Sequence, residues 1–217
     1  MPPHLPTAAE VIALHDRLLA TADWPADEPA APADGLWRWV QTNHRFNCRL
    51  WAEEDLARRT TVGDAEIAAN KRAIDGFNQA RNDATERVDE LLLMALGLVD
   101  AASARTDAPV ATVPAGARLN SETAGSIVDR MSIMALKVSA MRAQTLRSDV
   151  DAEHVEASRV KLARLQQQRA DLGDCLEALL ADALAGLAYF KVYRQFKMYN
   201  DPRFNPALVA ELARARR

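Results

Sequence analysis

VKLARLQQQRADLGDCLEALLADALAGLAYF, residues 160–190, is the stretch of sequence that most clearly indicates the fold class. Apolar residues recur along it at helical spacings, at Leu162, Leu165, Leu172, Leu176, Leu179, Ala183, Leu187 and Phe190. Arg169 is the one polar residue that interrupts this seam. Because residues three and four positions apart share one side of an α-helix, the seam predicts packing against other long helices. We expect this helix to begin near Ser148 or Asp149 and to end near Asn200.

Helical periodicity also covers most of the remaining chain. The further helices that it predicts span about 7–19, 36–59, 64–101 and 120–146, with a short tail helix over 206–217. Residues suited to an N-cap precede them, namely Thr7 in a capping box with Glu10, then Asp34, Asp64 and either Asn120 or Ser121. The segments 22–35 and 102–119 are predicted to be surface loops, because both combine proline with small and polar residues.

The fold class that follows is all-α. No segment alternates apolar and polar residues over a sustained length, as strands do, and no βαβ pattern or internal repeat is present. With 217 residues and only 8 glycines, the chain suits one domain of a few long elements. We therefore predict a single helical domain over residues 1–217. It is a bundle of about five helices, several of them long and antiparallel, with a short tail helix.

Composition excludes several classes of function. The net charge of −3 argues against a nucleic-acid-binding protein, which usually carries a strong basic field. Cys48 and Cys175 are far apart in the sequence and form no CxxC motif, so neither a disulfide framework nor a cysteine zinc site is expected. No 18-residue run is free of charge, so no membrane span is predicted. The N-terminus also lacks a secretory signal, and these features together predict a cytoplasmic protein.

Three of the predicted helices carry a polar stripe directly beside their apolar face. In the helix 36–59 the stripe contains Asn43, Asn47, Glu54 and Arg58, with His44, Trp51 and Asp55 next to it. In the helix 64–101 it contains Lys71, Asp75, Asn78, Asn82 and Asp89, with Arg81 pointing inward. In the helix 120–146 it contains Glu122, Ser126, Asp129, Arg130 and Lys137. Solvated helix faces favour Lys and Glu, whereas amides, Trp and Arg suit directed hydrogen bonds.

Two interpretations of these stripes remain open. They can meet in a polar cleft, where partial desolvation would shift pKa values and prepare side chains for binding or catalysis. They can equally form closed structural networks between helices. The locally basic segment KVYRQFKMYNDP (191–202) also has two possible interpretations, as a binding site and as a structural element. Arg194 and Lys197 can bind an anion such as a phosphate or the diphosphate of a sugar nucleotide, or simply complement the end of a helix.

The candidate chemistry is general acid–base catalysis rather than metal or nucleophilic catalysis. His44 and Cys48 are four residues apart and could share a metal, but no HExxH or paired ExxH motif is present, and we predict no metal site. No GxSxG motif marks a nucleophile, and nothing in the sequence identifies a cofactor. The acid–base candidates are His44, Glu54, Asp75, Glu122 and Asp129.

Four sequence blocks resemble the signature of the bacterial DUF4254 family. They are NHRFNCRLWAEED (43–55), VGDAEIAANKRAIDGFNQARND (62–83), SETAGSIVDRMSIMALK (121–137) and FKVYRQFKMYNDP (190–202). The resemblance covers about residues 37–206, and the blocks coincide with the polar stripes. The family name records an unknown function, so no mechanism can be transferred. Similar proteins are encoded among genes for glycosyltransferases and surface-polysaccharide assembly, which favours a role in that metabolism.

Two hypotheses follow. In the first, the chain is an enzyme or binding protein for an anionic sugar or sugar nucleotide. Arg130, Lys137, Arg194 and Lys197 then hold the anion, and all three stripes converge on one pocket with the end of the helix 148–200. In the second, it is a non-catalytic adaptor or homodimer that supports glycan-assembly enzymes. The second hypothesis predicts an exposed apolar patch on the leucine seam or around Leu36 and Trp37.

Overall fold

The computed structural model describes residues 5–26, 35–196, 198 and 201–215 of the chain. Its helices are α1 (Ala8–Leu19), α2 (Gly35–Leu56), α3 (Asp64–Ala95), α4 (Ala124–Thr145), α5 (Ala152–Leu184) and α6 (Pro206–Ala215). Two short strands, β1 (Arg118–Leu119) and β2 (Ala188–Tyr189), pair in parallel. The prediction of an all-α bundle of about five helices with a short tail helix is confirmed.

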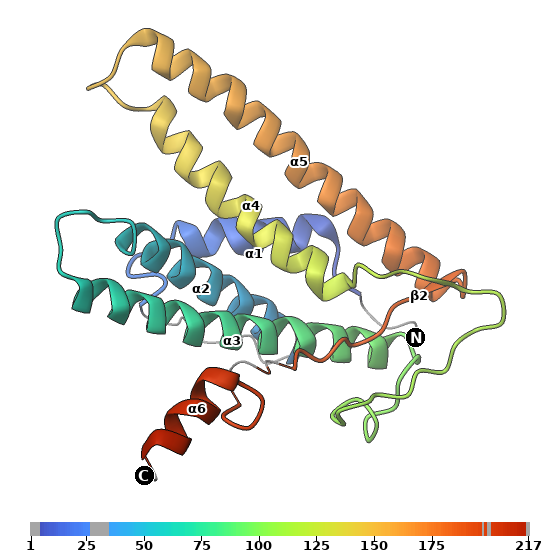
Figure 1. Ribbon diagram of the computed structural model, residues 1–217. Coiled ribbons are helices and arrows are strands. Elements are labelled where there is room, and N and C mark those ends of the chain that lie inside the picture. The colour runs from blue at the N-terminus through green and yellow to red at the C-terminus, as the bar shows by residue number, and fades with distance from the viewer. Residues whose placement is uncertain (1–4, 27–34, 197, 199–200, 216–217) are drawn as a thin grey trace.

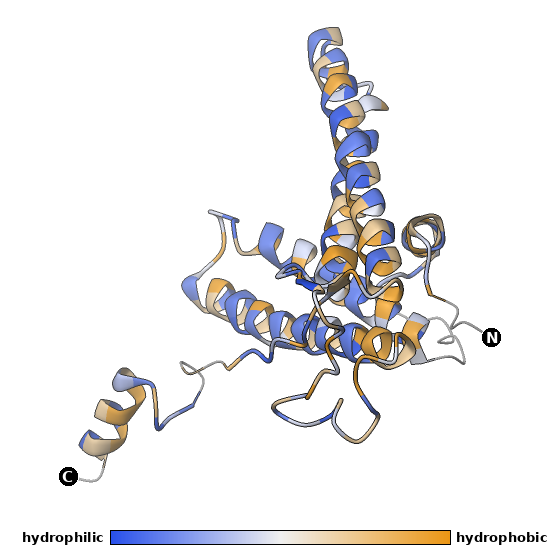
Figure 2. Cartoon of the chain, turned by 90° about the vertical axis from the view of Figure 1, so that its right-hand side faces the viewer, coloured by the Kyte–Doolittle hydropathy of each residue, from blue (hydrophilic) through white to orange (hydrophobic). Residues whose placement is uncertain are grey.

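Two helical hairpins make up the bundle (Figure 1). α2 lies against α3 and α4 lies against α5, in opposite directions within each pair, and α1 packs against α4 and α5. The core lies where the hairpins meet, and its largest fully buried apolar side chains are those of Phe190, Leu92, Leu93, Ile127, Met131 and Leu176. The far half of the α4–α5 hairpin extends beyond this core and is mostly hydrophilic (Figure 2). No helix of the described residues is long and apolar enough to cross a bilayer.

The start of α4 is fixed closely against α3 at Gly125. A Cβ atom at this position would lie 2.6 Å from the carbonyl oxygen of Thr85 and 2.8 Å from the carboxylate of Asp89. The Gly125 N–H donates a 2.6 Å hydrogen bond to Asp89 Oδ1. Thr123 is the N-cap, with its hydroxyl accepting from the N–H of Ser126, whereas Asn120 or Ser121 was the predicted cap. This contact sets the position at which the polar stripe of α4 passes over α2 and α3.

The predicted end of the long C-terminal helix is wrong. α5 ends at Leu184, not near Asn200, and Gly186 then takes a positive φ of 73° that turns the chain. The following residues are extended, with Ala188, Phe190 and Val192 buried in strict alternation. Leu187 is exposed and takes no part in the seam. The apolar residues after 184 therefore follow the period of two of an extended chain, which the helical spacing of the preceding seam concealed.

Other boundaries differ by smaller amounts. α3 ends at Ala95 instead of 101, because Gly97 takes a positive φ of 70° and the chain turns there. Its N-cap is Gly63, without a side-chain bond, and α5 is capped by Asp151 instead of Ser148 or Asp149. The capping box of Thr7 and Glu10 is confirmed. Asp34, the predicted cap of α2, lies outside the described residues, as does most of the predicted loop 22–35.

Candidate functional site

A buried polar network joins α2 to α4. The carboxylate oxygen Oδ1 of Asp129 accepts hydrogen bonds of 2.8 Å from the amide nitrogens of both Asn43 and Asn47. Asn47 also donates to the hydroxyl of Ser132 at 3.0 Å, and the same hydroxyl lies 2.7 Å from His44 Nδ1. The three α2 side chains are buried. Their spacing over one turn of helix lets all of them face α4, so this part of the interface between helices is held by directed hydrogen bonds.

His44 lies behind this network, out of reach of solvent. Its ring stacks on His15 at 4.4 Å between centroids and on Trp24 at 5.8 Å. Burial, reinforced by the charge of Arg169, lowers the pKa of His44 to about 3, so the imidazole is neutral near pH 7. The hydrogen bond between His44 Nδ1 and the Ser132 hydroxyl orients this hydroxyl toward Asn47, so His44 has a structural role. A ligand on the surface of α2 cannot reach this predicted acid–base residue.

Cys48 has no features of a metal ligand or a nucleophile. The indole N–H of Trp24 donates to its sulfur at 3.2 Å, and His44 Nε2 lies 3.8 Å from the same atom. Burial raises the pKa of the thiol to about 11, which keeps it protonated. Among the residues that the structure describes, no three His, Cys, Asp or Glu side chains are grouped to hold a metal ion.

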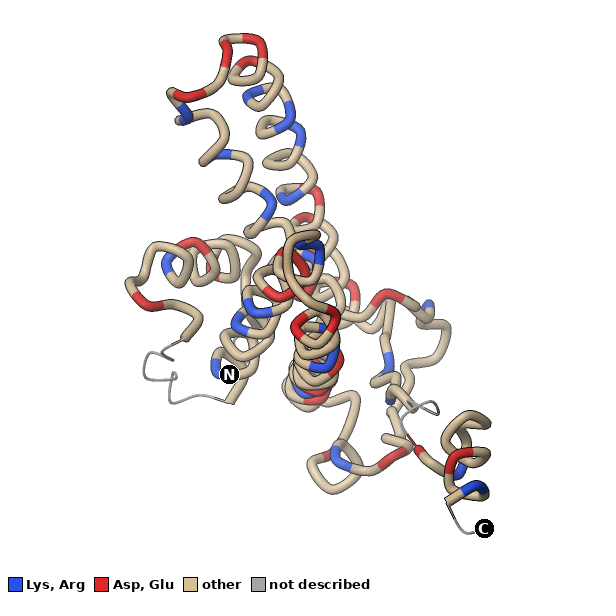
Figure 3. Tube along the Cα trace, turned by 60° about the vertical axis from the view of Figure 1, so that its left-hand side comes forward, with Lys and Arg blue, Asp and Glu red and all other residues tan. Residues whose placement is uncertain are grey.

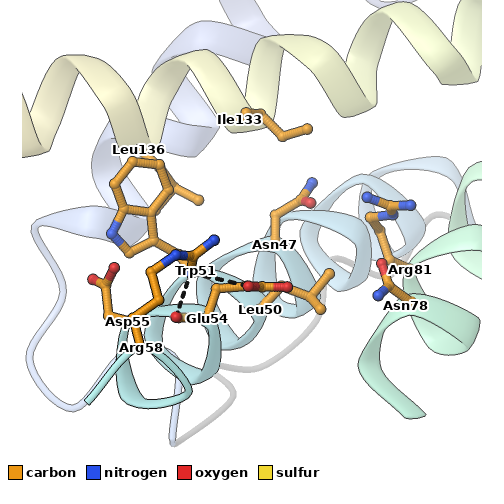
Figure 4. A pocket seen from close by; sticks show the side chains of 10 residues that line it. All are labelled: Asn47, Leu50, Trp51, Glu54, Asp55, Arg58, Asn78, Arg81, Ile133 and Leu136. Carbon is orange, nitrogen blue, oxygen red and sulfur yellow. Dashed lines mark hydrogen bonds and ion pairs between the residues drawn. The ribbon is translucent and has the colours of Figure 1, made fainter. Parts of the chain in front are cut away.

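A cleft of about 360 Å³ opens between α2, α3 and α4, on the solvent side of the network. We call it the α2–α3–α4 cleft, and its lining residues are Asn47, Leu50, Trp51, Glu54, Asp55, Arg58, Asn78, Arg81, Ile133 and Leu136. Figure 4 shows Trp51 beside Leu136 at one end and Asn78 with Arg81 at the other. Ile133 and Leu136 of α4 form its apolar side. The volume lies in the lower part of the range for small-molecule sites.

Helical register explains which α2 residues reach the cleft. Asn47, Trp51, Glu54, Asp55 and Arg58 follow one another at spacings of four, three, one and three residues, so they share one side of the helix. Arg58 belongs to the predicted polar stripe of this helix and Asp55 lies next to it, but neither is among the residues predicted to form a site. The register of the stripe would have identified both.

The charges at the two ends of the cleft are held differently. At the outer end, Arg58 pairs with Glu54 at 2.9 Å, and Lys71 lies 3.9 Å from the same carboxylate. These groups are solvent-exposed, so the pairs contribute little to stability and can exchange partners. At the inner end, Arg81 donates to Asn82 Oδ1 at 2.9 Å and lies 3.9 Å from Asp129. This guanidinium is less exposed and better oriented than that of Arg58.

The cleft lies within a region that matches a family model. Residues 37–192 match the model described as Protein of unknown function (DUF4254). The chain belongs to the DUF4254 family. The matched region includes every lining residue of the cleft and the whole buried network behind it. No curated protein and no solved structure matches this DUF4254 chain.

A relay of hydrogen bonds orients Arg81 from a distant part of the DUF4254 chain. The amide nitrogen of Asn82 donates to Gln195 Oε1 at 2.7 Å, which fixes the rotation of the Asn82 amide. Its oxygen Oδ1 is thereby directed to Arg81, whose Nε and Nη2 donate to it at 3.3 and 2.9 Å. Asn82 thus supports a cleft residue without lining the cleft itself. Gln195 was not predicted as a site residue, because no local pattern links it to α3.

Arg194 does not line the cleft, where the first hypothesis gathers it with the other candidate anion-binding residues. Its guanidinium pairs with Glu86 at 3.0 Å and Glu90 at 2.6 Å, and donates to the carbonyl oxygen of Ala104 at 2.9 Å. We call this cluster the Arg194 clasp. Its carboxylates already neutralise the cation, and its role is to hold the extended C-terminal segment on α3. Lys197 lies outside the described residues.

The remaining predicted residues of this DUF4254 chain are divided among separate places. Glu122, Arg130 and Lys137 line a second hollow between α4 and α5. Ser126 is engaged at the start of α4, 2.9 Å from the Thr123 hydroxyl. Asp75 is exposed on α3 outside the cleft lining. The structure therefore brings the α2 and α3 stripes together under α4, but it does not gather all the predicted residues in one pocket.

Proposed function

We propose that this DUF4254 protein is an enzyme or binding protein that takes an anionic sugar or sugar nucleotide in the α2–α3–α4 cleft. The observation that carries the proposal is the combination of a half-exposed indole, two amides and two guanidinium groups around one hollow. Trp51 offers a flat apolar surface and is 36% exposed. Such a combination of one apolar surface and several convergent polar groups is typical of small-molecule sites.

Each group of the cleft has a role in this proposal. The face of Trp51 packs against the apolar side of a sugar ring, together with Leu136, which lies beside it at the same end of the cleft. The amide of Asn78, which makes no hydrogen bond to the described residues, pairs with ring hydroxyl groups. Arg58 and Arg81 bind an anionic or hydroxyl oxygen of the sugar, since guanidinium groups donate two parallel hydrogen bonds to such oxygens. The proposed metabolism is that of surface polysaccharides.

Asp129 and Glu54 are the carboxylates suited to acid–base chemistry at this site. Asp129 is 16% exposed and adjoins Asn47 and Arg81, so a ligand in the cleft would lie beside it. Glu54 lies on the rim and is more exposed.

A thermal-shift screen of sugar 1-phosphates and UDP-, GDP- and dTDP-sugars, followed by calorimetry, tests the proposal. Trp51→Ala and Asn78→Ala are expected to weaken binding by about tenfold each, because both remove direct contacts. Arg72→Ala, on an exposed part of α3 outside the cleft, is the matched control and should change the dissociation constant by less than about twofold. An absence of stabilisation by every compound up to millimolar concentrations would contradict the proposal.

One observation favours the alternative of a non-catalytic adaptor or homodimer. α6 carries no buried residue, although Val209 and Leu212 give it an apolar side. The leucine seam and the region around Leu36 and Trp37, where this alternative predicts an exposed apolar patch, are covered. Leu172, Leu176 and Leu179 of the seam are buried. Leu36 and Trp37 pack against the core. Light scattering coupled to size exclusion, comparing the full chain with a chain truncated after residue 205, separates the alternatives. A dimer that the truncation converts to a monomer favours the adaptor.

A further inference from the structure

The second hollow, between α4 and α5, has a volume of about 560 Å³. We call it the α4–α5 groove, and its lining residues are Glu122, Arg130, Ile133, Met134, Lys137, Gln168, Asp171, Leu172 and Cys175. Ile133 lines both this groove and the α2–α3–α4 cleft. The two hollows therefore adjoin on the two sides of one residue of α4, and a ligand longer than a single sugar ring can extend from one into the other.

The hairpin that forms the groove is basic over most of its length. Residues 130–148 and 157–170 contain no Asp or Glu, and their cations are Arg130, Lys137, Arg142, Arg147, Arg159, Lys161, Arg164 and Arg169. Figure 3 shows these basic positions along both helices, below an acidic tip. Four of them form ion pairs, namely Arg130 with Glu122, Arg147 with Asp149, Arg159 with Glu156 and Arg169 with Asp16. Lys137, Arg142, Lys161 and Arg164 have no ion pair within the described part of the chain.

Three of these four unpaired cations lie on the groove side of the hairpin. Lys137 lines the groove directly, together with Gln168 of α5. Lys161 and Arg164 precede Gln168 by seven and four residues, which places all three on one side of α5. They extend the basic surface from Lys137 toward the tip of the hairpin. Arg142 is five residues beyond Lys137, about 140° further around α4, and lies on the other side of the hairpin.

We infer that the α4–α5 groove binds the phosphate groups of a nucleoside diphosphate sugar whose sugar occupies the α2–α3–α4 cleft, an inference that rests on the proposed function. Unpaired cations in a segment without acids attract phosphate without first breaking an ion pair. The acids of the groove lie toward its base, where Glu122 is engaged by Arg130, and Asp171 accepts from Gln167 at 2.8 Å. The phosphates therefore bind beside Lys137, on the side nearer the hairpin tip.

The competing explanation is a general attraction of the hairpin for polyanions such as nucleic acid. A polyanion that follows the hairpin would use cations on both sides, and Arg142 would then matter as much as Lys137. A diphosphate is short and contacts one side only. The net charge of the chain, −3, also favours a local anion site over a broad basic surface.

Isothermal titration of the full chain with UDP-glucose, GDP-mannose and inorganic pyrophosphate tests the inference. Lys137→Gln and Arg164→Gln are each expected to weaken binding of the nucleotide sugars and of pyrophosphate by about five- to tenfold, as each removes a charged hydrogen bond. Arg142→Gln is the matched control and should change them by less than about twofold. Trp51→Ala should weaken the nucleotide sugars while leaving pyrophosphate binding unchanged.

Three results would overturn the inference, and they differ in what they mean for the proposed function. If Lys137→Gln and Arg164→Gln have no effect while Trp51→Ala still weakens a nucleotide sugar, the groove assignment fails and the cleft stands. If Lys137→Gln, Arg164→Gln and Arg142→Gln weaken binding equally, the whole positive charge of the hairpin attracts the anion, and the groove is not a specific site. If no nucleotide sugar or sugar 1-phosphate binds at all, the proposed function fails and the groove inference fails with it.

Discussion

The Arg194 clasp and the α2–α3–α4 cleft each contain an arginine and each use side chains of α3, with opposite outcomes. In the clasp, two carboxylates with little exposure and the backbone oxygens of Ala104 and Thr106 surround one guanidinium, so its hydrogen-bonding capacity is consumed. In the cleft, Arg81 and Asn78 face a hollow and keep donors that the described residues do not use. The proposed binding roles of Arg81 and Asn78 rest on this difference, because their unused donors remain available to a ligand.

This comparison also explains why four sequence blocks with similar composition have different roles. The block at 190–202 supplies the clasp, which holds the C-terminal segment in place. The blocks at 43–55 and 62–83 supply the cleft. The block at 121–137 contributes to the network, the cleft and the groove, because α4 crosses all three. Charge pairing between helices, which depends on the fold, therefore decides which of these blocks keeps unpaired polar groups at a hollow.

Gly125→Ala is expected to have the largest effect, because it disturbs the frame that carries both regions. A Cβ atom 2.6 Å from the Thr85 carbonyl oxygen would push α4 away from α3, and backbone cannot move aside cheaply. We expect a loss of about 3 to 4 kcal/mol in the free energy of unfolding, measured by urea denaturation. Gly76→Ala is the matched control, since nothing lies within 4 Å of its Cβ. It should stabilise α3 by about 0.5 to 1 kcal/mol.

Arg194→Ala tests the clasp alone. Removal of the cation leaves Glu86 with the N–H of Gln195 as its donor, while Glu90, which is only 3% exposed, keeps its pair with Arg87. We expect a loss of about 2 kcal/mol in unfolding free energy, because the remaining partners offset part of the cost of the lost cation. The matched control is Arg203→Ala, whose pair with Asp201 is exposed and should contribute less than about 0.5 kcal/mol. Equal effects of the two substitutions would show that the clasp is an ordinary surface pair.

The buried titratable groups behind the cleft predict the pH dependence of stability. Burial lowers the pKa of His15 well below its usual value and that of His44 to about 3, so the unfolded chain binds more protons at these sites below pH 6.5. Their contribution is present above pH 6.5 and is lost as the pH falls. Burial raises the pKa of Asp89 to about 7, which acts in the opposite direction between pH 4 and 7. Two imidazoles outweigh one carboxyl, so stability falls on acidification.

The expected slope is small near pH 6.5, where Asp89 offsets most of the histidine titration, and rises to about 1.4 kcal/mol per pH unit near pH 5, which corresponds to one net proton taken up on unfolding. Urea denaturation at a series of pH values measures it. Asp89→Asn removes the opposing carboxyl and should make the slope about twice as steep. A flat profile in this range would mean that the two imidazoles are accessible to protons in the folded state, and that the closed network behind the cleft opens readily.

Much of the fold could be predicted from the sequence, because helical periodicity is a local property. The stripe that contains Asn47, Trp51 and Glu54 marks the α2 side of the cleft for the same reason. The end of α5 could not be predicted, since Leu187 and Phe190 continue the helical spacing of the seam, while Ala188 and Phe190 equally fit the alternation of an extended chain. The pairing of Arg194 with Glu86 could not be predicted from the sequence either. It depends on where the extended C-terminal segment lies in space, which the spacing of residues along the chain does not indicate.

The smallest and most specific prediction concerns Gln195, which connects the two regions. It follows the clasp residue Arg194 directly, and through Asn82 it orients the cleft residue Arg81. Gln195→Ala should leave the free energy of unfolding within about 1 kcal/mol of the wild type, because only one neutral hydrogen bond is lost. The Asn82 amide is then free to rotate, and ligand affinity in the cleft should fall by about three- to tenfold. Calorimetry with a cleft ligand measures the effect. Gln195→Glu retains the accepting oxygen and should keep the affinity, whereas equal losses in both variants would mean that Arg81 is oriented without the relay.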